Sequence, residues 1–175
     1  GGNGLSGTGP KAGGPLYLAR LQLPEPAAAD TGTSGLPTEL ADFLAWLQAE
    51  GHDGDAELAR RQAAVAPSLA TRILAGPVGQ RDEYRTRPRG CIGIEAETAS
   101  GFHLALAAAL ATGNRIVAVR APVDLGRLPP PIRARIGRDG NVDAVLFEGG
   151  GDALVRLQTE LAGRPGPIVP VHAVS

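Results

Sequence analysis

The sequence contains no methionine, only one cysteine and few aromatic residues. The single cysteine, Cys91, has no partner for an internal disulfide, which is typical of chains that fold in a reducing compartment. Aromatic residues make up 3% of the chain and hydrophobic residues 43%, so the core is expected to be aliphatic and rich in alanine. No run approaches the roughly 18 apolar residues of a membrane span. We therefore expect a cytoplasmic chain with neither a transmembrane segment nor a secretory leader.

The charge balance gives no general reason to expect nucleic acid or an anionic membrane as a partner, because the net charge is -1. One local cluster of arginines exists, and it comprises Arg81, Arg85, Arg87 and Arg89. Asp82 and Glu83 interrupt this cluster, which favours a solvated hairpin over a nucleic-acid site.

The chain begins with Gly1-Gly2-Asn3-Gly4, and glycines at a terminus lose backbone entropy on ordering without packing in return. We interpret the sequence as a fragment that continues a longer chain upstream. It ends on the last predicted strand, so we expect truncation at that end as well.

The composition divides the chain into four segments. Residues 1–23 combine a glycine-rich loop with a loosely alternating strand, Leu16–Leu23, which either pairs with other chain or forms a disordered arm. Residues 24–37 are rich in Pro, Ala, Gly, Ser and Thr and are predicted to be a linker. Residues 38–75 carry helical signals, and residues 76–175 alternate strands with helices.

The helical segment has a clear apolar stripe in its first helix. Thr38 is the expected N-cap, Gly51 ends the run, and Trp46 lies off the stripe, where it can meet another surface. The stripe consists of Leu40, Phe43, Leu44 and Leu47. A second helix, capped by Asp55, is expected to carry Leu58 and Val65.

After the break at Pro67, the pattern predicts a restarted helix from Ser68 toward Ile73. The remainder predicts a parallel sheet, because its short apolar strands alternate with helices. The expected strands are Cys91–Ile94, Ile116–Val119, Val142–Phe147 and Pro167–Ala173, and the expected helices are 98–112, Ile132–Ile136 and Asp152–Ala162. The predicted fold class is α/β, a half-Rossmann open parallel sheet with flanking helices.

The candidate chemistry in this segment is sparse. Cys91 opens a buried strand, so we interpret it as a packing residue and not as a nucleophile. The histidines, His52, His103 and His172, lack metal-ligand spacing, so they are interpreted as surface or packing residues and no metal site is predicted.

The turn Glu148–Asp152 matches only part of a Gly-x-Gly-x-x-Gly phosphate loop. The acidic residues at its ends favour a capped helix over a bound anion. A dinucleotide site that uses Arg120 with Gly149 and Gly151 remains the alternative interpretation.

Two motifs carry a resemblance to a known family. The run from Gly1 to Tyr17 resembles the C-terminal end of the glutamate-semialdehyde dehydrogenase domain of the bacterial proline utilization A family. The runs Gly76–Tyr84, Pro88-Arg89-Gly90 and Ala111-Thr112-Gly113-Asn114 are similar to the extra C-terminal domain of the long enzymes of that family. That domain is a degenerate relative of aldehyde dehydrogenases.

The resemblance implies a parent enzyme that oxidises proline on FAD, oxidises the semialdehyde to glutamate with NAD, and passes the intermediate through a tunnel. The family's reactive cysteine and glutamate lie upstream of Gly1, so no catalytic residue and no bound cofactor are expected in this chain. The loop with Gly1, Gly2, Leu5 and Ser6 is expected near the substrate, and Leu16–Leu23 is expected to mediate homo-oligomerisation. A peripheral position of the parent at the inner membrane is left open.

The implied role of residues 76–175 is that of a tunnel lid and an assembly support. Where relatives bind the nucleotide, this chain has Glu95-Ala96-Glu97-Thr98 and Arg120-Ala121-Pro122, and the two glutamates would repel a pyrophosphate. Two alternatives stay open, a residual dinucleotide-binding module and a simple dimerisation module. The domain boundaries that follow are 1–23, 24–37, 38–75 and 76–175, with the last segment truncated.

Overall fold

The computed structural model describes residues 36–67, 69, 71–74, 81–137 and 140–173. The predicted strand Leu16–Leu23 and the loop before it lie outside these residues. Along the described chain the helices are α2 (Thr38–Ala49), α3 (Asp53–Ala64), α4 (Ala99–Ala111), the 3-10 turn η2 (Leu125–Arg127), α5 (Pro130–Arg135) and α6 (Gly151–Ala162). The strands are β1 (Arg72–Leu74), β2 (Asp82–Tyr84), β3 (Cys91–Ala96), β4 (Arg115–Arg120), β5 (Ile136–Gly137), β6 (Ala144–Glu148) and β7 (Val171–Ala173).

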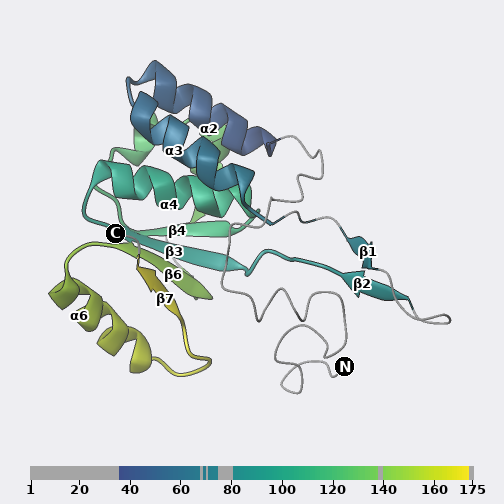
Figure 1. Ribbon diagram of the computed structural model, residues 1–175. Coiled ribbons are helices and arrows are strands. Elements are labelled where there is room, and N and C mark those ends of the chain that lie inside the picture. Colours follow the sequence, from purple (N-terminus) through teal and green to yellow (C-terminus); the bar gives the residue numbers. More distant parts are fainter. Residues whose placement is uncertain (1–35, 68, 70, 75–80, 138–139, 174–175) are drawn as a thin grey trace.

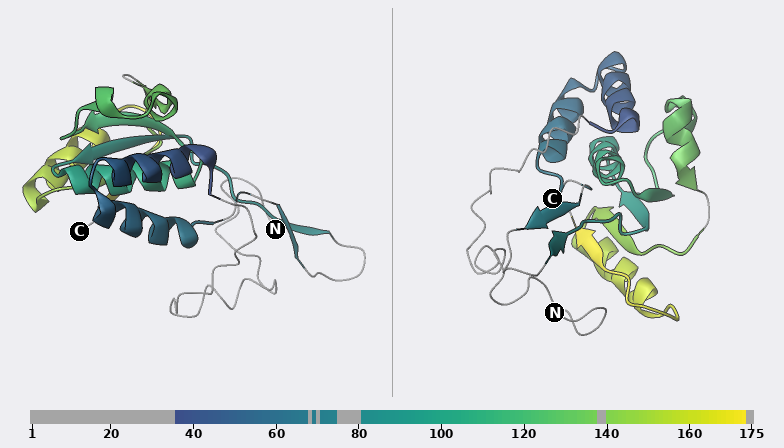
Figure 2. Two further views of the ribbon diagram at one scale, coloured as in Figure 1. Left: turned by 90° about the horizontal axis from the view of Figure 1, so that it is seen from above. Right: turned by 90° about the vertical axis from the view of Figure 1, so that its right-hand side faces the viewer.

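Five strands form one parallel sheet in the order β5-β4-β3-β6-β7. Helices α2, α3 and α4 cover one face of this sheet, and α6 covers the other (Figure 1). The end-on view in Figure 2 shows α4 between the α2/α3 pair and the strands. The predicted open parallel sheet with flanking helices is therefore confirmed. Every residue of β3 is buried, as a central strand covered on both faces requires.

The two faces of the sheet carry separate hydrophobic clusters. The larger cluster joins the apolar stripe of α2, the inner side of α4 and strand residues such as Ile94 and Ile116. The smaller one joins α6 to β3 and β6 through Leu157, Val145 and Cys91. Full burial of a Leu or Phe side chain contributes about 1.5–3 kcal/mol, so the four buried stripe residues of α2 fasten that helix to the sheet domain.

Thr112-Gly113-Asn114 forms the connection between α4 and β4, and its residue types suit that position. Gly113 has a φ of 67°, a left-handed conformation that favours glycine after a helix. Asn114 is buried, and its side-chain oxygen accepts the Gly90 N–H at 3.0 Å. The two short motifs that were recognised in the sequence thus contact each other at the amino end of β3.

Four local predictions for residues 38–75 are wrong. The N-cap of α2 is Pro37, and Thr38 is its first helical residue. The N-cap of α3 is His52, and Asp55, the predicted cap, lies inside the first turn of the helix. Helix α3 buries Ala56 and Ala59, while Leu58 and Val65 are 47% and 68% exposed. The apolar stripe of α3 is narrower than predicted because α3 packs through small residues.

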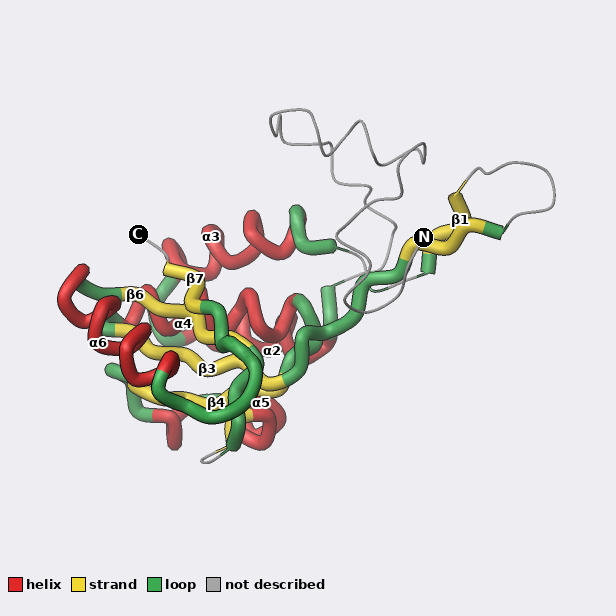
Figure 3. Tube along the Cα trace, turned by 90° about the horizontal axis from the view of Figure 1, so that it is seen from below, coloured by secondary structure: helices red, strands yellow, loops and turns green. Residues whose placement is uncertain are grey.

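The predicted helix toward Ile73 is instead strand β1, which pairs antiparallel with β2. This ribbon projects away from the five-stranded sheet (Figure 3). Pro67 ends the helical run, and β-branched Ile73 then favours extended backbone. Within the arginine-rich segment, Glu83 forms ion pairs with Arg81 at 2.8 Å and with Arg85.

Candidate functional site

The carboxyl ends of β3 and β6 form the position where an open α/β sheet ordinarily binds a ligand. From β3 the chain moves through α4 to β4 on one side, and from β5 it returns to β6 on the other. The strand order therefore reverses between β3 and β6, which makes a topological switch point. Glu95, Glu97 and Glu148 all lie at or just beyond these strand ends.

The carboxylate of Glu148 occupies the amino end of α4. Its Oε2 accepts the backbone N–H groups of Glu97 and Thr98, each at 2.9 Å. One turn further, the Thr98 hydroxyl accepts the Gly101 N–H at 3.0 Å and caps the helix. A helix amino end offers N–H groups and a partial positive charge to anions, and here the protein's own carboxylate takes that place.

The position of Glu148 differs from the sequence-based prediction. The sequence predicts that Glu148 lies at the amino end of the helix after its own turn, which is α6. Helix α6 instead begins at an N-cap, Gly150, without a side-chain cap, and Glu148 binds across the sheet to the start of α4. The signal in the sequence was an acidic strand end, and only the β3–β6 pairing assigns it to a helix 50 residues earlier.

Arg120 and Gly149, two residues of the alternative dinucleotide site, meet at Glu97. The Arg120 guanidinium lies 3.6 Å from Glu97 Oε1. A Cβ on Gly149 would stand 2.8 Å from the Glu97 carboxyl carbon, so Gly149 admits that side chain. Gly151, the third residue, is the exposed first residue of α6, and nothing lies within 4 Å of its Cβ position. The structure thus gathers Arg120 and Gly149 around an acidic residue.

A second polar cluster lies on the opposite side of the α4 amino end. Asp55, in the first turn of α3, accepts a hydrogen bond from the Ser100 hydroxyl at 2.5 Å through Oδ1. Its other oxygen, Oδ2, lies 2.7 Å from Nδ1 of His103. The ring of His52 lies 4.8 Å from that of His103, centroid to centroid. Together His52, Asp55, Ser100 and His103 form what we call the α3–α4 polar cluster.

The environment of this cluster is asymmetric. His103 is 1% exposed and packs edge-on against Trp46 and Phe43, whereas His52 is exposed. A cavity of about 180 Å³ opens beside both histidines and is lined also by Glu50, Asp124 and Arg127. The predicted off-stripe contact of Trp46 is thereby confirmed.

The pKa of Asp55 lies below its ordinary value. Burial alone would raise the pKa, but the hydrogen bonds with Ser100 and His103 and the electrostatic interactions with His103 and His52 together outweigh that effect. Asp55 is therefore a carboxylate at neutral pH. Sequence spacing did not indicate this cluster, because His103 follows Asp55 by 48 residues.

The remaining sequence candidates are distributed elsewhere. Cys91 is buried at 6% exposure in the cluster beneath α6, as expected for a packing residue. His172 is exposed on β7. The loop with Gly1, Gly2, Leu5 and Ser6 lies outside the described residues. None of the helices in the described part of the chain has the length and apolar character needed to cross a bilayer.

Comparison with known proteins gives matches in sequence and in fold. Over its whole length the chain is 37% identical to the bifunctional protein PutA of Rhizobium meliloti, and it spans 15% of that protein. Over 98% of its length it is 32% identical to the PutA of Escherichia coli, again spanning 15%. The structure of AldH from Staphylococcus aureus matches 77% of this chain and 40% of its own, with a TM-score of 0.51 and 17% identity. No protein-family model matches the chain.

The structural match to AldH shows that the fold is of the aldehyde dehydrogenase type. At 17% sequence identity, this match is evidence for the fold alone. Within that class, the chain is similar along its entire length to one segment of the bifunctional PutA proteins.

Proposed function

We propose that the chain is the non-catalytic, C-terminal portion of a bifunctional proline dehydrogenase and glutamate-semialdehyde dehydrogenase. Support comes from the match of the whole chain to 15% of the much longer PutA proteins. In this proposal FAD and NAD act elsewhere in the longer polypeptide, and the upstream dehydrogenase domain is the partner of this chain. The sequence-based domain boundaries at 23, 37 and 75 belong to the same proposal.

The observation that carries the proposal is the carboxylate of Glu148 at the start of α4. A pyrophosphate at this switch point would compete with Glu148 for the N–H groups of Glu97 and Thr98. It would also approach the side chains of Glu95 and Glu97 at the same edge, and like charges repel. A sheet with this arrangement keeps the shape of a nucleotide-binding domain and serves as a support.

The first test is calorimetric titration of the 175-residue chain with NAD, together with an assay of semialdehyde oxidation. We expect no saturable heat and no turnover. Saturable binding that Arg120→Ala abolishes would instead establish the second candidate, a residual dinucleotide-binding module. The observation that favours this candidate is the position of Arg120 and Gly149 around the switch point.

The lid role needs the longer polypeptide. We expect the intact bifunctional enzyme to convert proline to glutamate without a lag, and a version that lacks residues 76–175 to show a lag while the intermediate accumulates in solution. Equal time courses for the two enzymes, with both active sites separately functional, would contradict the lid role.

Assembly through Leu16–Leu23 is proposed from the family resemblance. Light scattering of the chain with and without residues 1–35 measures it, and we expect a smaller particle after the deletion than the lost mass explains. An unchanged oligomeric state would exclude both this strand contact and the simple dimerisation module built on it.

A further inference from the structure

The α3–α4 polar cluster brings together three side chains that are common metal ligands. His52, Asp55 and His103 each offer one donor atom, and these three atoms lie within 4.8 Å of one another. Two imidazole nitrogens and one carboxylate oxygen make a donor set suited to Zn²⁺ and its neighbours among the transition metals. This set differs from the oxygen-only set that Mg²⁺ and Ca²⁺ prefer.

The three donor atoms lie within 4.8 Å of one another and would have to draw closer together to form a zinc site. In a tetrahedral site with bonds of about 2.0–2.1 Å, ligand atoms lie roughly 3.3 Å apart. Asp55 Oδ2 and His103 Nδ1, now 2.7 Å apart, would separate by about half an ångström to share such an ion in place of a hydrogen. The third ligand, His52, has an exposed side chain whose ring lies 4.8 Å from that of His103, centroid to centroid, and it would turn toward the other two donors to complete the site.

The backbone and the neighbouring side chains position all three donor residues. His52 precedes α3, and its N–H donates to Leu47 O at 2.8 Å, which fixes the start of that side chain. Ser100 donates to the second oxygen of Asp55 at 2.5 Å, an outer contact of the kind that orients carboxylate ligands. The rings of Trp46 and Phe43 pack edge-on against the ring of His103.

An ion at this place would have room for a further ligand. The cavity of about 180 Å³ beside His52 and His103 is large enough for water molecules or a small substrate group. Three protein ligands and an open fourth position are the usual composition of a zinc site that binds or activates a small molecule.

We propose that His52, Asp55 and His103 bind a divalent transition-metal ion, with Zn²⁺ as the best match, and thereby clamp α3 to α4. The site is independent of the NAD and semialdehyde experiments above, because it lies on the other side of α4 from Glu148 and uses none of the same residues.

The experiment is calorimetric titration of the chain with Zn²⁺ alone, paralleled by visible absorption on titration with Co²⁺. Trp46, the only tryptophan, lies 5.9 Å from the His103 ring and reports the same event by fluorescence. We expect one equivalent of Zn²⁺ to bind, a rise in the thermal unfolding midpoint, a change in Trp46 emission and Co²⁺ bands of tetrahedral intensity.

The variants assign the site. His52→Ala removes an exposed ligand without touching the core, and we expect it to weaken Zn²⁺ binding more than tenfold; Ser100→Ala, an outer contact, should weaken it roughly tenfold. His172→Ala and Cys91→Ala are the matched controls, because they remove the third histidine and the only thiol. Neither control should change the affinity.

Two results would overturn the proposal. One is the absence of saturable Zn²⁺ binding to the unmodified chain. The other is binding that His52→Ala leaves unchanged or that His172→Ala or Cys91→Ala abolishes. Circular dichroism confirms that each variant is folded, and the exposed position of His52 makes His52→Ala the variant on which the comparison rests.

Discussion

The carboxylate of Asp55 lies 2.7 Å from Nδ1 of His103 and joins the first turn of α3 to the second turn of α4. The Trp46 ring packs edge-on against His103, and the Ser100 hydroxyl donates a hydrogen bond to the same Asp55 carboxylate. On the other side of α4, Glu148 binds the N–H groups that precede the helix. The amino end of α4 is thus held between two carboxylates.

Asp55 is expected to give the chain an acid limb, which is a fall in the free energy of unfolding at low pH. A carboxyl group whose folded-state pKa is lowered stabilises the fold above its unfolded value of 3.8, and this contribution is lost as the pH falls through the folded-state pKa. Near neutral pH, Asp55→Asn should cost about 2 kcal/mol, because it removes a hydrogen-bonded charge. Urea unfolding at a series of pH values measures the difference, which should shrink as the pH drops below 3.8.

Asp53→Asn is the control for this series, since Asp53 is exposed in the same helical turn. It should change stability little, and without the same pH profile. A destabilisation by Asp55→Asn that is equal at every pH would contradict the assignment of the acid limb to this carboxylate.

Gly101→Ala is expected to destabilise the chain, although alanine ordinarily stabilises a helix more than glycine does. Alanine in place of a helical glycine ordinarily stabilises by about 1 kcal/mol. At Gly101, however, an added Cβ would stand 2.6 Å from the Glu148 carboxyl carbon and would displace that side chain from two N–H groups. Thermal unfolding should therefore show Gly101→Ala to be destabilising, and Gly54→Ala, with nothing within 4 Å, to be stabilising.

The coupling between Gly101 and Glu148 can be measured directly. In a Glu148→Ala background the obstacle is gone, so adding Gly101→Ala should then stabilise the chain. A double-mutant cycle measures this sign change as an interaction free energy. Additive effects of the two substitutions would show that the carboxylate does not lie over Gly101 in solution.

Phe102 is expected to be the most sensitive core position of α4. Its side chain is fully buried within the cluster that joins α2, α4 and the sheet. Phe102→Ala should lower the free energy of unfolding by about 3–5 kcal/mol, because it leaves a cavity between layers. Val155→Ala on the outer side of α6, where Val155 is 62% exposed, should change it by less than about 0.5 kcal/mol. Chemical denaturation measures both, and similar losses at the two positions would contradict the assigned layers.

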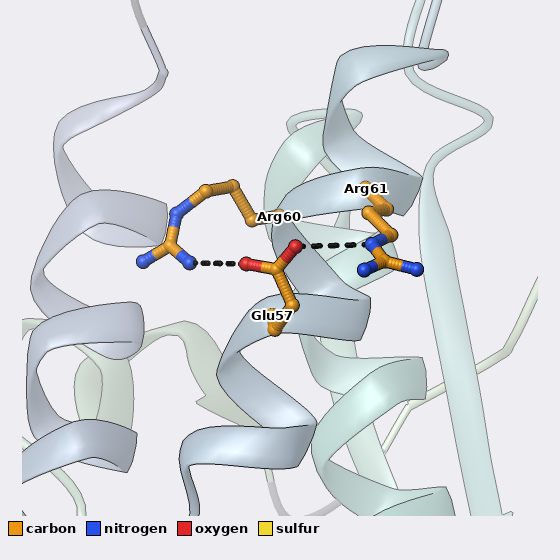
Figure 4. A network of polar contacts seen from close by, with 3 residues as sticks. All are labelled: Glu57, Arg60 and Arg61. Atoms are coloured by element: carbon orange, nitrogen blue, oxygen red, sulfur yellow. Dashed lines mark hydrogen bonds and ion pairs between the residues drawn. The ribbon is translucent and has the colours of Figure 1, made fainter.

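Glu57 belongs to a polar network that should contribute little to the stability of the fold. It binds Arg60 and Arg61, each at 3.0 Å, on the exposed side of α3 (Figure 4). Hydrogen bonds from Arg61 and then Arg60 lower the pKa of Glu57, but solvent and salt screen the pairs. Glu57→Gln should leave the thermal midpoint unchanged at physiological salt. A marked drop that persists in high salt would show that the network stabilises the fold.

After residue 90 the order of strands and helices was readable from the sequence, apart from the two-residue strand β5, which was not predicted. Apolar runs such as Cys91–Ile94 and helix signals such as Thr98 act over a few residues, so the chain states them locally. The helix predicted toward Ile73 was wrong at the residues that form β1, because the conformation of a short segment with both helical and extended signals depends on the partner it pairs with. There the partner is β2.

The sequence by itself determined the parallel sheet, the buried state of Cys91 and the presence of acidic residues at the carboxyl ends of β3 and β6, since each follows from residue type and near neighbours. Only the tertiary structure decided that Glu148 belongs to α4 and that His52, Asp55 and His103 share one place. These contacts join residues about 50 positions apart, and no local pattern encodes which strand or helix will lie beside another. The packing of apolar faces determines which elements are neighbours, and the polar groups then form hydrogen bonds with the groups that packing places beside them.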